Sequence, residues 1–549
     1  MLYYVRFCES REGFALVMFN SIPFLIGFAV FLILYAFCPK RYTMILMLAA
    51  SVLFLAVNSW QAGLWALGFT AVSYVLGYCV EQTSSRKLAT VCSAAILTIA
   101  LVTFKLLNVS MLGMSFYLFS FLSYVIDVGR GTIAAEHSPL RFASFSFFFP
   151  KYVQGPITRY GELSGQLDRP RCSLATMQVG LCYFILGFAM KVLLSGPLMT
   201  LWDGKYNAIS TIGYESISTK LAWFGAAVTS LQIFLDWQAY TFMAMGIAGA
   251  LGYRLPQNFN YPYIARTIGD YYRRWHMTLM RFFKDYVYIP LGGSRAGLGR
   301  TVMNVLLVWL LTSLWHSNGM HPKYLLWGVA ASAAVIADPI WSRRFRRGNG
   351  ADGEASPLAA ALLGHIWLIL LLPITVWVLW KPAQGVNFIL WGMTIGVCIV
   401  LERLWKTFVV QRFRIGERLE KKGLIGTVWK CFVSVLAHIW VLIPIMVTWV
   451  MFTIRDYGDL RLYLGRLFPA PGKTAGFLPG DYQAKWKLVG WQFVVGLLFC
   501  FPLPERILRR VSRSKVGSWI LSVLMAALFW YTVYRLGKVG SDPMGYAAF

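Results

Sequence analysis

Long apolar runs recur along the whole chain and constrain its fold more than any other feature. An α-helix needs roughly 20 apolar residues to cross the hydrocarbon core of a bilayer. Ten runs come near that length: 22–38, 62–80, 88–104, 176–202, 221–251, 324–340, 357–380, 386–401, 425–454 and 518–534. Four shorter runs, which could instead re-enter the membrane, are 42–57, 112–126, 301–315 and 488–503. We therefore predict an all-α, polytopic transmembrane helical bundle of 11 to 14 membrane segments, some of them re-entrant.

Charged residues are scarce and unevenly distributed. Only 13% of the residues are charged, compared with about 25% in an average soluble domain, yet the net charge is +28. Lys and Arg residues are concentrated in five connections between the apolar runs: 128–172, 252–300, 341–349, 411–423 and 505–515. Two apolar runs lie between each of these connections and the next. This alternation is typical of cytoplasmic loops of membrane proteins and not of nucleic-acid binding. We expect a multi-pass membrane protein that contacts lipids and no nucleic acid.

The chain has the organisation of one domain. It shows no internal repeat, and neither a GxxxxGK[ST] loop nor a G-x-S-x-G elbow, so nucleotide hydrolysis and serine hydrolase chemistry lack their usual motifs. Residues 1–17 fit a signal peptide poorly because three charged residues interrupt the apolar region. We treat them as a possible N-terminal extension before a start at Met18. Residues 18–549 then form a single membrane domain, with a core at 110–345 and C-terminal helices at 357–535.

His316 ends the apolar run 301–315, in the stretch "LLTSLWHSNGMHPKYLLWG". The run starts beside a basic connection, and its helix would rise about 24 Å, so His316 should lie inside the membrane. An ionisable side chain at that depth is costly and indicates a function. A proton relay, a metal ligand, a general base and a satisfied core residue all remain open. We expect no metal site, because no Cys, Asp or second His follows at three or four residues.

A second histidine, His276, lies within "GDYYRRWHMTLMRFFKDYVYIPLGG". Read as one continuous helix, this segment surrounds His276 with apolar residues and places its basic residues on another flank. The pattern predicts an interfacial or re-entrant helix whose basic flank meets lipid phosphates or an anionic ligand. A buried structural histidine explains His276 as well as a catalytic one does.

A polar stripe interrupts the apolar run 221–251. Gln232, Asp236 and Tyr240 recur every four residues and so share one face of a helix. Such a face must point to the protein interior or to a water-filled cavity. Both a substrate-binding surface and a hydrogen-bonded contact between helices fit this pattern.

Several motifs together resemble a known family of membrane proteins. They are "FLDWQAYTFMAMGIAGALGYRLPQNFNYPYIARTIGDYYRRWHMTLMRFFKDYVYIPLGGSR", followed by "LWH" and "LWG", with support from "FFFPKYVQGPITRY" and "VTWVMFTIRDYGDLRLYLGRLF". The combination is similar to the membrane-bound O-acyltransferase (MBOAT) family, within it to the alginate O-acetyltransferase branch. The likeness runs over most of residues 18–470.

The resemblance implies an O-acyltransferase, most simply an O-acetyltransferase and not an aminoacyl transferase, in the bacterial cell (inner) membrane. His316 matches the catalytic histidine of the family's "LWH" element, and His276 matches its frequent companion. An imidazole titrates near neutral pH and can remove the proton of an attacking hydroxyl.

The family's reactants and partners are implied in the same way. The acyl donor would be a cytoplasmic thioester, acetyl-CoA or an acylated carrier protein, with no bound cofactor. The acceptor would be an extracytoplasmic cell-envelope polysaccharide, reached with the help of an extracytoplasmic acetyltransferase partner. Arg273 and Arg274 are candidates for binding the donor's phosphates.

The chain departs from the family pattern just after the "LWH" element. The family usually has Gly there, whereas here Ser317 follows and the Trp–Gly pair comes eleven residues after His316. The enlarged loop would reshape the acceptor entrance, with Trp315 and Asn318 as candidate substrate contacts. His321, inside the loop, could assist His316.

Two other functions remain as alternatives. Transfer of D-alanine to teichoic acid uses a similar "NRWH" element, although "DYVYIPLGGSR" favours the polysaccharide branch. A proton-coupled membrane transporter would also use buried His and Asp residues. An inverted repeat would favour the transporter, and the sequence shows none.

Overall fold

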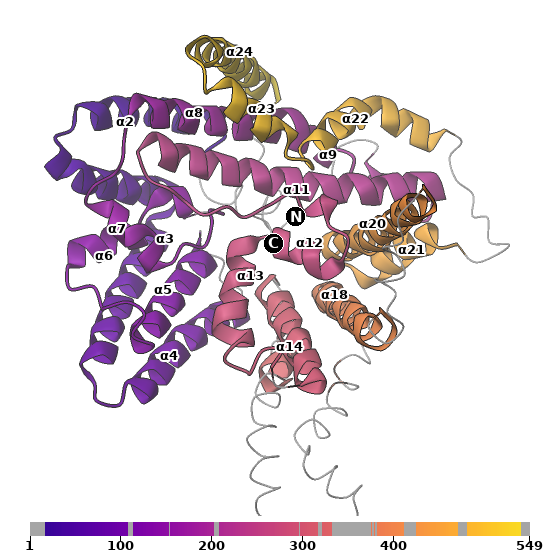
Figure 1. Cartoon of the computed structure of the whole chain (residues 1–549), viewed down its shortest axis with the longest axis horizontal. Coiled ribbons are helices and arrows are strands. Elements are labelled where there is room, and N and C mark those ends of the chain that lie inside the picture. The colour runs from indigo at the N-terminus through magenta and orange to yellow at the C-terminus, as the bar shows by residue number, and fades with distance from the viewer. Residues whose placement is uncertain are drawn as a thin grey trace, which may run out of the picture.

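The computed structural model describes most of the chain, and every regular element in the described part is a helix. The described residues are 17–107, 113–152, 154–202, 208–295, 297–316, 321–324, 326–331, 375, 378, 382–410, 424–469 and 480–539. This confirms the predicted all-α class. Figure 1 shows α3 to α7 gathered at one end of the molecule and α18, α20, α21 and α22 at the other.

The helices, in chain order, have the following bounds: α2 Ile22–Phe37, α3 Thr43–Gln82, α4 Arg86–Leu106, α5 Met114–Gly129, α6 Pro139–Ser146, η2 Phe149–Lys151, α7 Tyr160–Leu167, α8 Leu174–Ala189, η3 Met190–Ser195, α9 Gly196–Met199, α10 Ile209–Ile212, α11 Thr219–Ala250, α12 Ile268–Arg274, α13 Met277–Phe283, η5 Lys284–Tyr288, α14 Leu298–His316, α18 Val386–Trp405, α20 Leu424–Thr453, α21 Tyr457–Leu467, α22 Asp481–Leu498, α23 Leu503–Val511 and α24 Lys515–Val539.

Seven stretches of helix within the described residues are long and apolar enough to cross a membrane. They lie at Lys40–Gln82, Arg86–Lys105, Leu174–Met199, Leu298–His316, Val386–Phe408, Thr427–Thr453 and Lys515–Lys538. The pair α22 and α23, bent by 62°, would make an eighth. The chain is therefore a multi-pass membrane protein. Two predicted runs, 324–340 and 357–380, fall mostly outside the described residues, so the total of 11 to 14 segments stays a prediction.

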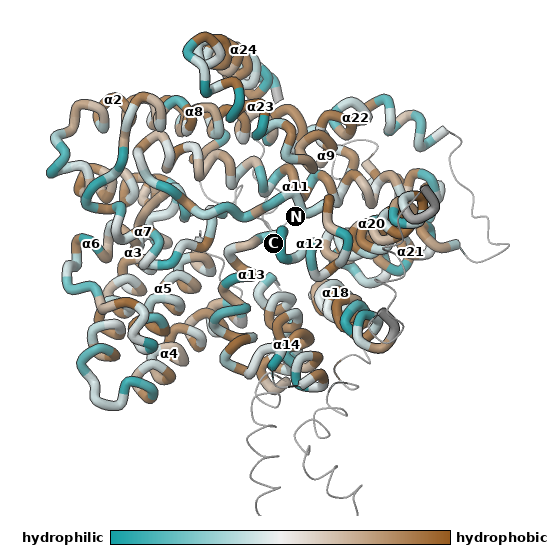
Figure 2. The backbone as a smooth tube through the Cα atoms, viewed as in Figure 1, coloured by the Kyte–Doolittle hydropathy of each residue, from teal (hydrophilic) through white to brown (hydrophobic). Residues whose placement is uncertain are grey.

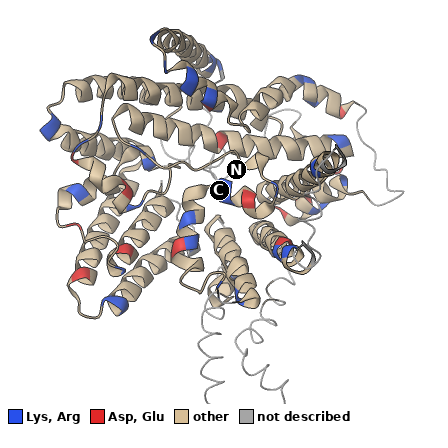
Figure 3. Cartoon of the chain, in the orientation of Figure 1, with Lys and Arg blue, Asp and Glu red and all other residues tan. Residues whose placement is uncertain are grey.

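Hydrophobic and charged residues occupy different parts of the bundle. Figure 2 shows hydrophobic residues dominating α2, α4, α8 and α24, with hydrophilic residues concentrated in the connections. Figure 3 shows most charged residues at helix ends and between helices. α3 contains two of the predicted runs, and they are separate helices, because Ser59 leaves the helical conformation at φ −168° and ψ 102°.

Helices α8 and α11 form the spine on which both ends of the molecule pack (Figure 1). They approach closely because glycines line their contact. A Cβ atom on Gly180 would lie 2.3 Å from the amide nitrogen of Ala250, and one on Gly246 would lie 2.4 Å from that of Phe184. α11 contributes buried side chains to two apolar clusters, one around α2 to α7 and one around α18 and α20.

The connection from α6 to α7, residues 147–158, folds into the interior of the protein, and we call it the re-entrant segment. All of its described side chains are buried. Its tip reaches the start of α5, where a Cβ atom on Gly113 would lie 2.1 Å from the carbonyl oxygen of Tyr152. α5 has 16 residues and is about 24 Å long, so the tip lies far from the end of α5 that leads to Arg130.

Candidate active site

His276 occupies a break between two short helices. α12 ends at Arg274 and α13 begins at Met277, and His276 between them has φ 41° and ψ 54°. The predicted single helix through this segment is therefore wrong, because the backbone turns left-handed at the histidine. A non-glycine residue in that conformation stores about 1–3 kcal/mol and persists only where its surroundings impose it. The His276 side chain is buried, with 2% of its surface exposed, and this fits both the structural and the catalytic interpretation.

The loop before α12 imposes the turn. The amide of Asn260 donates to the carbonyl of Arg274 at 2.9 Å, and the amide of Met277 donates to the carbonyl of Asn258 at 2.7 Å. The hydroxyl of Thr278 donates to the side-chain oxygen of Asn258 at 2.6 Å. These bonds hold the backbone on both sides of His276.

Two further elements fix the same turn. The amide of Ile157, in the re-entrant segment, donates to the Thr278 hydroxyl at 3.1 Å. The carboxylate of Glu402, on α18, accepts hydrogen bonds from the first two amides of α12, those of Ile268 and Gly269. The bond from Gly269 is 3.1 Å long, and the bond from Ile268 is shorter. A carboxylate at this end of α12 satisfies its free amides and complements its dipole. Nothing in the local sequence pointed to Glu402.

The His276 side chain is enclosed by aromatic rings. Its ring centre lies 4.3 Å from that of Trp237 and 6.1 Å from that of Trp315. Neither ring nitrogen has a hydrogen-bond partner among the described residues. Burial lowers the pKa of His276 to about 3, so the imidazole is neutral at pH 7. Unpaired buried polar atoms in a strained turn are typical of a functional site.

His316 ends α14 and packs against Trp315. Its ring centre is 4.3 Å from that of Trp315, and edge-to-face contacts with Trp391 and Phe452 lie at 5.2 and 5.3 Å. The side chain is only 6% exposed. Both His276 and Lys105 lie within electrostatic reach of His316. Sequence reasoning missed Lys105, which the fold brings from the end of α4.

The structure brings the two predicted histidines together around one tryptophan. Trp315, a predicted substrate contact, neighbours both rings and has an indole N–H without a partner among the described residues. Asn318 lies outside the described residues. His321 is exposed, and its ring nitrogen accepts from the amide of Lys323 at 3.3 Å.

The polar stripe on α11 lies inside the protein. Asp236 accepts from Lys191 at 2.6 Å and from Ser195 at 2.9 Å, and both members of the ion pair are 1% exposed. Gln232 donates to Ser195 at 3.3 Å, and Tyr240 is fully buried. These contacts join α11 to η3, so they match the helix-contact interpretation. Substrate binding by the stripe stays a prediction.

The two predicted phosphate-binding arginines contact an acidic residue of their own helix. Arg273 and Arg274 both pair with Asp270, at 3.3 and 2.9 Å. The side chain of Arg273 is 72% exposed, that of Arg274 29%. Arg273 therefore has free surface to meet an anion.

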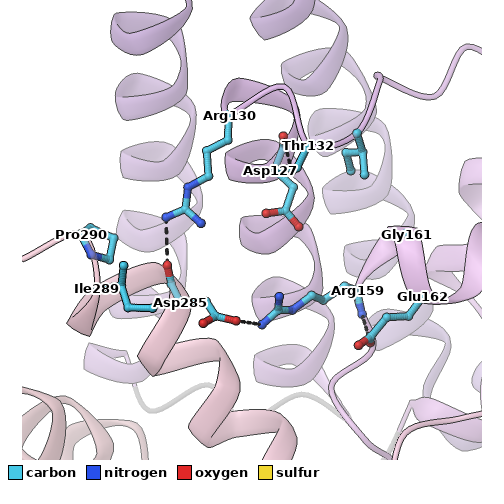
Figure 4. Close-up of a pocket in the computed structure, with 10 residues that line it drawn as sticks. Asp127, Arg130, Thr132, Arg159, Gly161, Glu162, Asp285, Ile289 and Pro290 are labelled. Carbon is cyan, nitrogen blue, oxygen red and sulfur yellow. Dashed lines mark hydrogen bonds and ion pairs between the residues drawn. The ribbon is translucent and has the colours of Figure 1, made fainter. Parts of the chain in front are cut away.

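A cavity of about 690 Å³ opens where the end of α5 and the start of α7 meet η5. Figure 4 shows Arg130 and Arg159 converging on Asp285. Arg130 donates to the backbone carbonyl of Asp285 at 2.9 Å, and Arg159 donates to the carboxylate of Asp285 at 2.7 Å. Both guanidinium groups also lie near the ring of Tyr286, at 5.1 and 5.0 Å.

Most N–H groups of Arg130 and Arg159 are not used by their contacts to Asp285. Each guanidinium carries five N–H groups, and the contacts to Asp285 use few of them. Phosphate or carboxylate oxygens would meet the remaining N–H groups, in a lining that also holds the carboxylates of Asp127, Glu162 and Asp285. Sequence reasoning missed these two arginines, although Arg159 stands in "GPITRY", part of one of the motifs that carried the resemblance. The described residues hold no group of three His, Cys, Asp or Glu side chains that could bind a metal ion.

Comparison with known proteins gives a consistent picture. The model of the membrane-bound O-acyltransferase family matches residues 100–377. A protein of Pseudomonas aeruginosa named "Probable alginate O-acetylase AlgI" is 36% identical over 214 residues, which cover 39% of this chain and 40% of that protein.

More distant relatives have other names. The "Peptidoglycan O-acetyltransferase" of Helicobacter pylori is 32% identical over 211 residues, covering 38% of this chain and 39% of that protein. The "Teichoic acid D-alanyltransferase" of Bacillus subtilis is 27% identical over 232 residues, which cover 39% of this chain and 56% of that protein. The chain thus spans less than two thirds of each relative's length.

Proposed function

The chain belongs to the membrane-bound O-acyltransferase family, and from this premise we propose that it transfers an acyl group, most simply acetyl, to hydroxyls of an extracytoplasmic cell-envelope polysaccharide. The donor is a cytoplasmic thioester, either acetyl-CoA or an acylated carrier protein. The membrane is the bacterial inner membrane, and a separate extracytoplasmic acetyltransferase completes delivery. The observation that carries the proposal is the placement of His276 and His316 around Trp315 inside the bundle.

The proposed step needs one base and no covalent enzyme intermediate. His316 takes the proton of the acceptor hydroxyl while that oxygen attacks the thioester carbonyl carbon. The new C–O bond forms, the C–S bond breaks, and the thiolate leaves and takes the proton from His316. The expected gain from a well-placed general base is about 10²–10⁴-fold.

His276 is suited to the carbonyl oxygen. Its ring is neutral and has both nitrogens unpartnered among the described residues, so an N–H can be donated to the developing oxyanion. A donor held ready in a buried site stabilises that charge more strongly than water does. The strained turn at His276 keeps the ring in place before substrate arrives.

Both histidines are nearly covered by aromatic side chains, so the reactants enter only when those side chains move. Trp315 is an aromatic neighbour of both histidine rings. We assign it the role of a gate between the donor side and the acceptor side.

The cavity beside Arg130 and Arg159 is the proposed anchor for the donor's phosphates. It lies at the end of the α13–η5 helix, and Asp285 is nine residues beyond His276, a rise of about 13 Å in a helix. A flexible thioester arm anchored there would run along α13 towards the histidines. Arg273 and Arg274 remain a second candidate anchor at the α12 end.

The decisive experiment is replacement of His316 with Ala in cells that lack any paralogue. Ester-linked acetate on the cell's exopolysaccharide and peptidoglycan should disappear while the protein stays inserted. A His137→Ala variant, which removes an exposed histidine outside the site, is the matched control and should keep the ester. Persistent esterification with the His316→Ala protein would refute the proposal. Transfer of D-alanine instead of acetate to an envelope polymer would identify the alternative reaction of the family.

A further inference from the structure

Helix α23 (Leu503–Val511) connects two long apolar helices. α22 precedes it at an angle of 62°, and α24, which contains the candidate membrane span Lys515–Lys538, follows after a short turn. Four arginines lie between positions 506 and 513, and Figure 3 shows Lys and Arg where α23 meets α24. Arginine inside the hydrocarbon core of a bilayer is costly, so we place α23 at the level of the lipid headgroups.

One side of α23 is buried against the protein. Glu505 and Leu508 are 8% and 5% exposed. The hydroxyl of Tyr183, on α8, donates to the Glu505 carboxylate at 3.2 Å, and Arg509 donates to the same carboxylate at 3.4 Å. The acidic residue of α23 therefore faces inward, and these two partners share its charge.

The other side of the segment presents three arginines, which we call the basic patch: Arg506, Arg510 and Arg513. Arg506 and Arg510 are four residues apart and share one face of the helix. Arg513 lies in the turn after α23, where its amide donates to the carbonyl of Arg510 at 3.4 Å. All three residues are exposed, and no ion pair within the described residues includes them. The basic patch can therefore meet an external anion.

Exposed apolar side chains adjoin the basic patch. Leu503 and Ile507 are 51% and 53% exposed, and at 100° per residue both lie within about 60° of Arg510 around the helix. Trp519, near the start of α24, is 75% exposed, and tryptophan is enriched where a membrane meets water. A soluble anion or an acidic protein surface would match the arginines alone. A phospholipid matches both groups, with its phosphate on the arginines and its acyl chains on the apolar side chains.

We propose that the basic patch, together with Leu503 and Ile507, binds phospholipids of net negative charge, such as phosphatidylglycerol. The phosphate oxygens accept hydrogen bonds from the three guanidinium groups, and the lipid holds α23 in place between α8 and α24. A Lys or Arg near an anionic membrane surface strengthens binding roughly fivefold, so three together give about a hundredfold preference over a zwitterionic lipid. The inference concerns lipid binding and does not depend on the proposed acyl transfer.

Thermal unfolding of the purified full chain in detergent tests the site, with phosphatidylglycerol replacing phosphatidylcholine at constant total lipid. Phosphatidylglycerol should raise the midpoint saturably, by about 2–4 °C. The variant Arg506→Gln/Arg510→Gln/Arg513→Gln should lose most of this rise.

A control variant changes three exposed cations outside the basic patch to Gln, namely Lys40, Arg41 and Lys87. It loses the same charge as the patch variant, and it should keep the rise in the midpoint. An equal response of the two variants would overturn the proposal, and so would an equal midpoint of the unaltered protein in the two lipids.

A second measurement uses the unaltered protein alone and distinguishes the lipid from other anions. Glycerol 3-phosphate and polyglutamate carry the charge without acyl chains, so neither should raise the midpoint at the same concentration of negative charge. A rise with glycerol 3-phosphate as large as with phosphatidylglycerol would assign the basic patch to a soluble anion and overturn the proposal. The same rise with polyglutamate would assign it to an acidic protein partner and overturn it as well.

Discussion

The backbone carbonyl oxygen of Asn258 lies 2.7 Å from the amide nitrogen of Met277, the residue after His276. The two residues are 19 positions apart, and their bond sets where the helix breaks. The side chain of Asn258 adds a second bond, to Thr278. The position of the His276 ring is thus decided by a loop that contains no catalytic group.

Loss of the Thr278 hydroxyl should lower acyl transfer, because this hydroxyl helps to hold the turn that positions His276. In Thr278→Val the hydroxyl is lost, and the side chain of Asn258 and the amide of Ile157 lose a partner. Leaving buried polar groups unpaired costs about 1–3 kcal/mol, so we expect transfer to fall about tenfold or more. Thr278→Ser keeps the hydroxyl and should restore most of the activity. Equal activity of the two variants, assayed as acetyl transfer in membranes, would exclude this role.

Close contact between α14 and α18 should position His316. A Cβ atom on Gly392 would lie 1.9 Å from the hydroxyl oxygen of Ser313 and 2.9 Å from the carbonyl oxygen of Trp309. Gly392→Ala should therefore push α14 away and destabilise the protein by about 1–3 kcal/mol, with loss of transfer.

Gly68→Ala is the matched control for that substitution. Gly68 also lies in an apolar helix, but a Cβ atom there has no neighbour within 4 Å. A double variant that adds Ser313→Ala should recover part of the lost stability. Thermal midpoints in detergent measure all three proteins, and an unchanged midpoint for Gly392→Ala would refute the close contact.

The buried imidazole of His276 should make the protein sensitive to acid. Its pKa is about 3 in the folded protein and about 6.5 in an unfolded chain. Because the folded value is the lower one, the contribution to stability is complete above pH 6.5 and is lost as the pH falls towards 3. The slope is about 1.4 kcal/mol per pH unit for one proton.

His276→Asn removes the titrating group and keeps a residue that tolerates the left-handed conformation. The thermal midpoint of this variant should fall less steeply between pH 6.5 and pH 4.5 than that of the unaltered protein. Parallel curves would show that His276 does not take up a proton on unfolding.

The arginines of the α5–η5 cavity should govern donor affinity. Arg130→Ala and Arg159→Ala should each raise the KM for the thioester about tenfold, since hydrogen bonds to charged groups contribute roughly 1.5–3 kcal/mol, while kcat changes little. Added salt should weaken the effect. Arg266→Ala, a change at an exposed position, is the control.

Steady-state kinetics in membranes distinguish the two candidate anchors. A rise in KM for Arg273→Ala and Arg274→Ala, without one for Arg130→Ala and Arg159→Ala, would place the donor's phosphates at the α12 end.

Local sequence patterns predicted the helices well and their breaks less well. The apolar runs matched α2, α4, α18 and α24 closely, because the length of a membrane helix follows from bilayer thickness. The break at His276 was missed, because helical periodicity in "DYYRRWHMTLMRFF" continues through it. Hydrogen bonds from a distant loop overrode that periodicity.

The sequence by itself determined the class of the protein, the burial of both histidines and their candidate chemistry, since hydrophobicity and motif identity are properties of neighbouring residues. Tertiary structure alone decided which groups meet. It placed Trp315 beside His276, Glu402 at the start of α12, Asp236 beside Lys191, and the tip of the re-entrant segment against α5. These pairings join residues tens to hundreds of positions apart, and they depend on how closely packed helices fit, which no local pattern encodes.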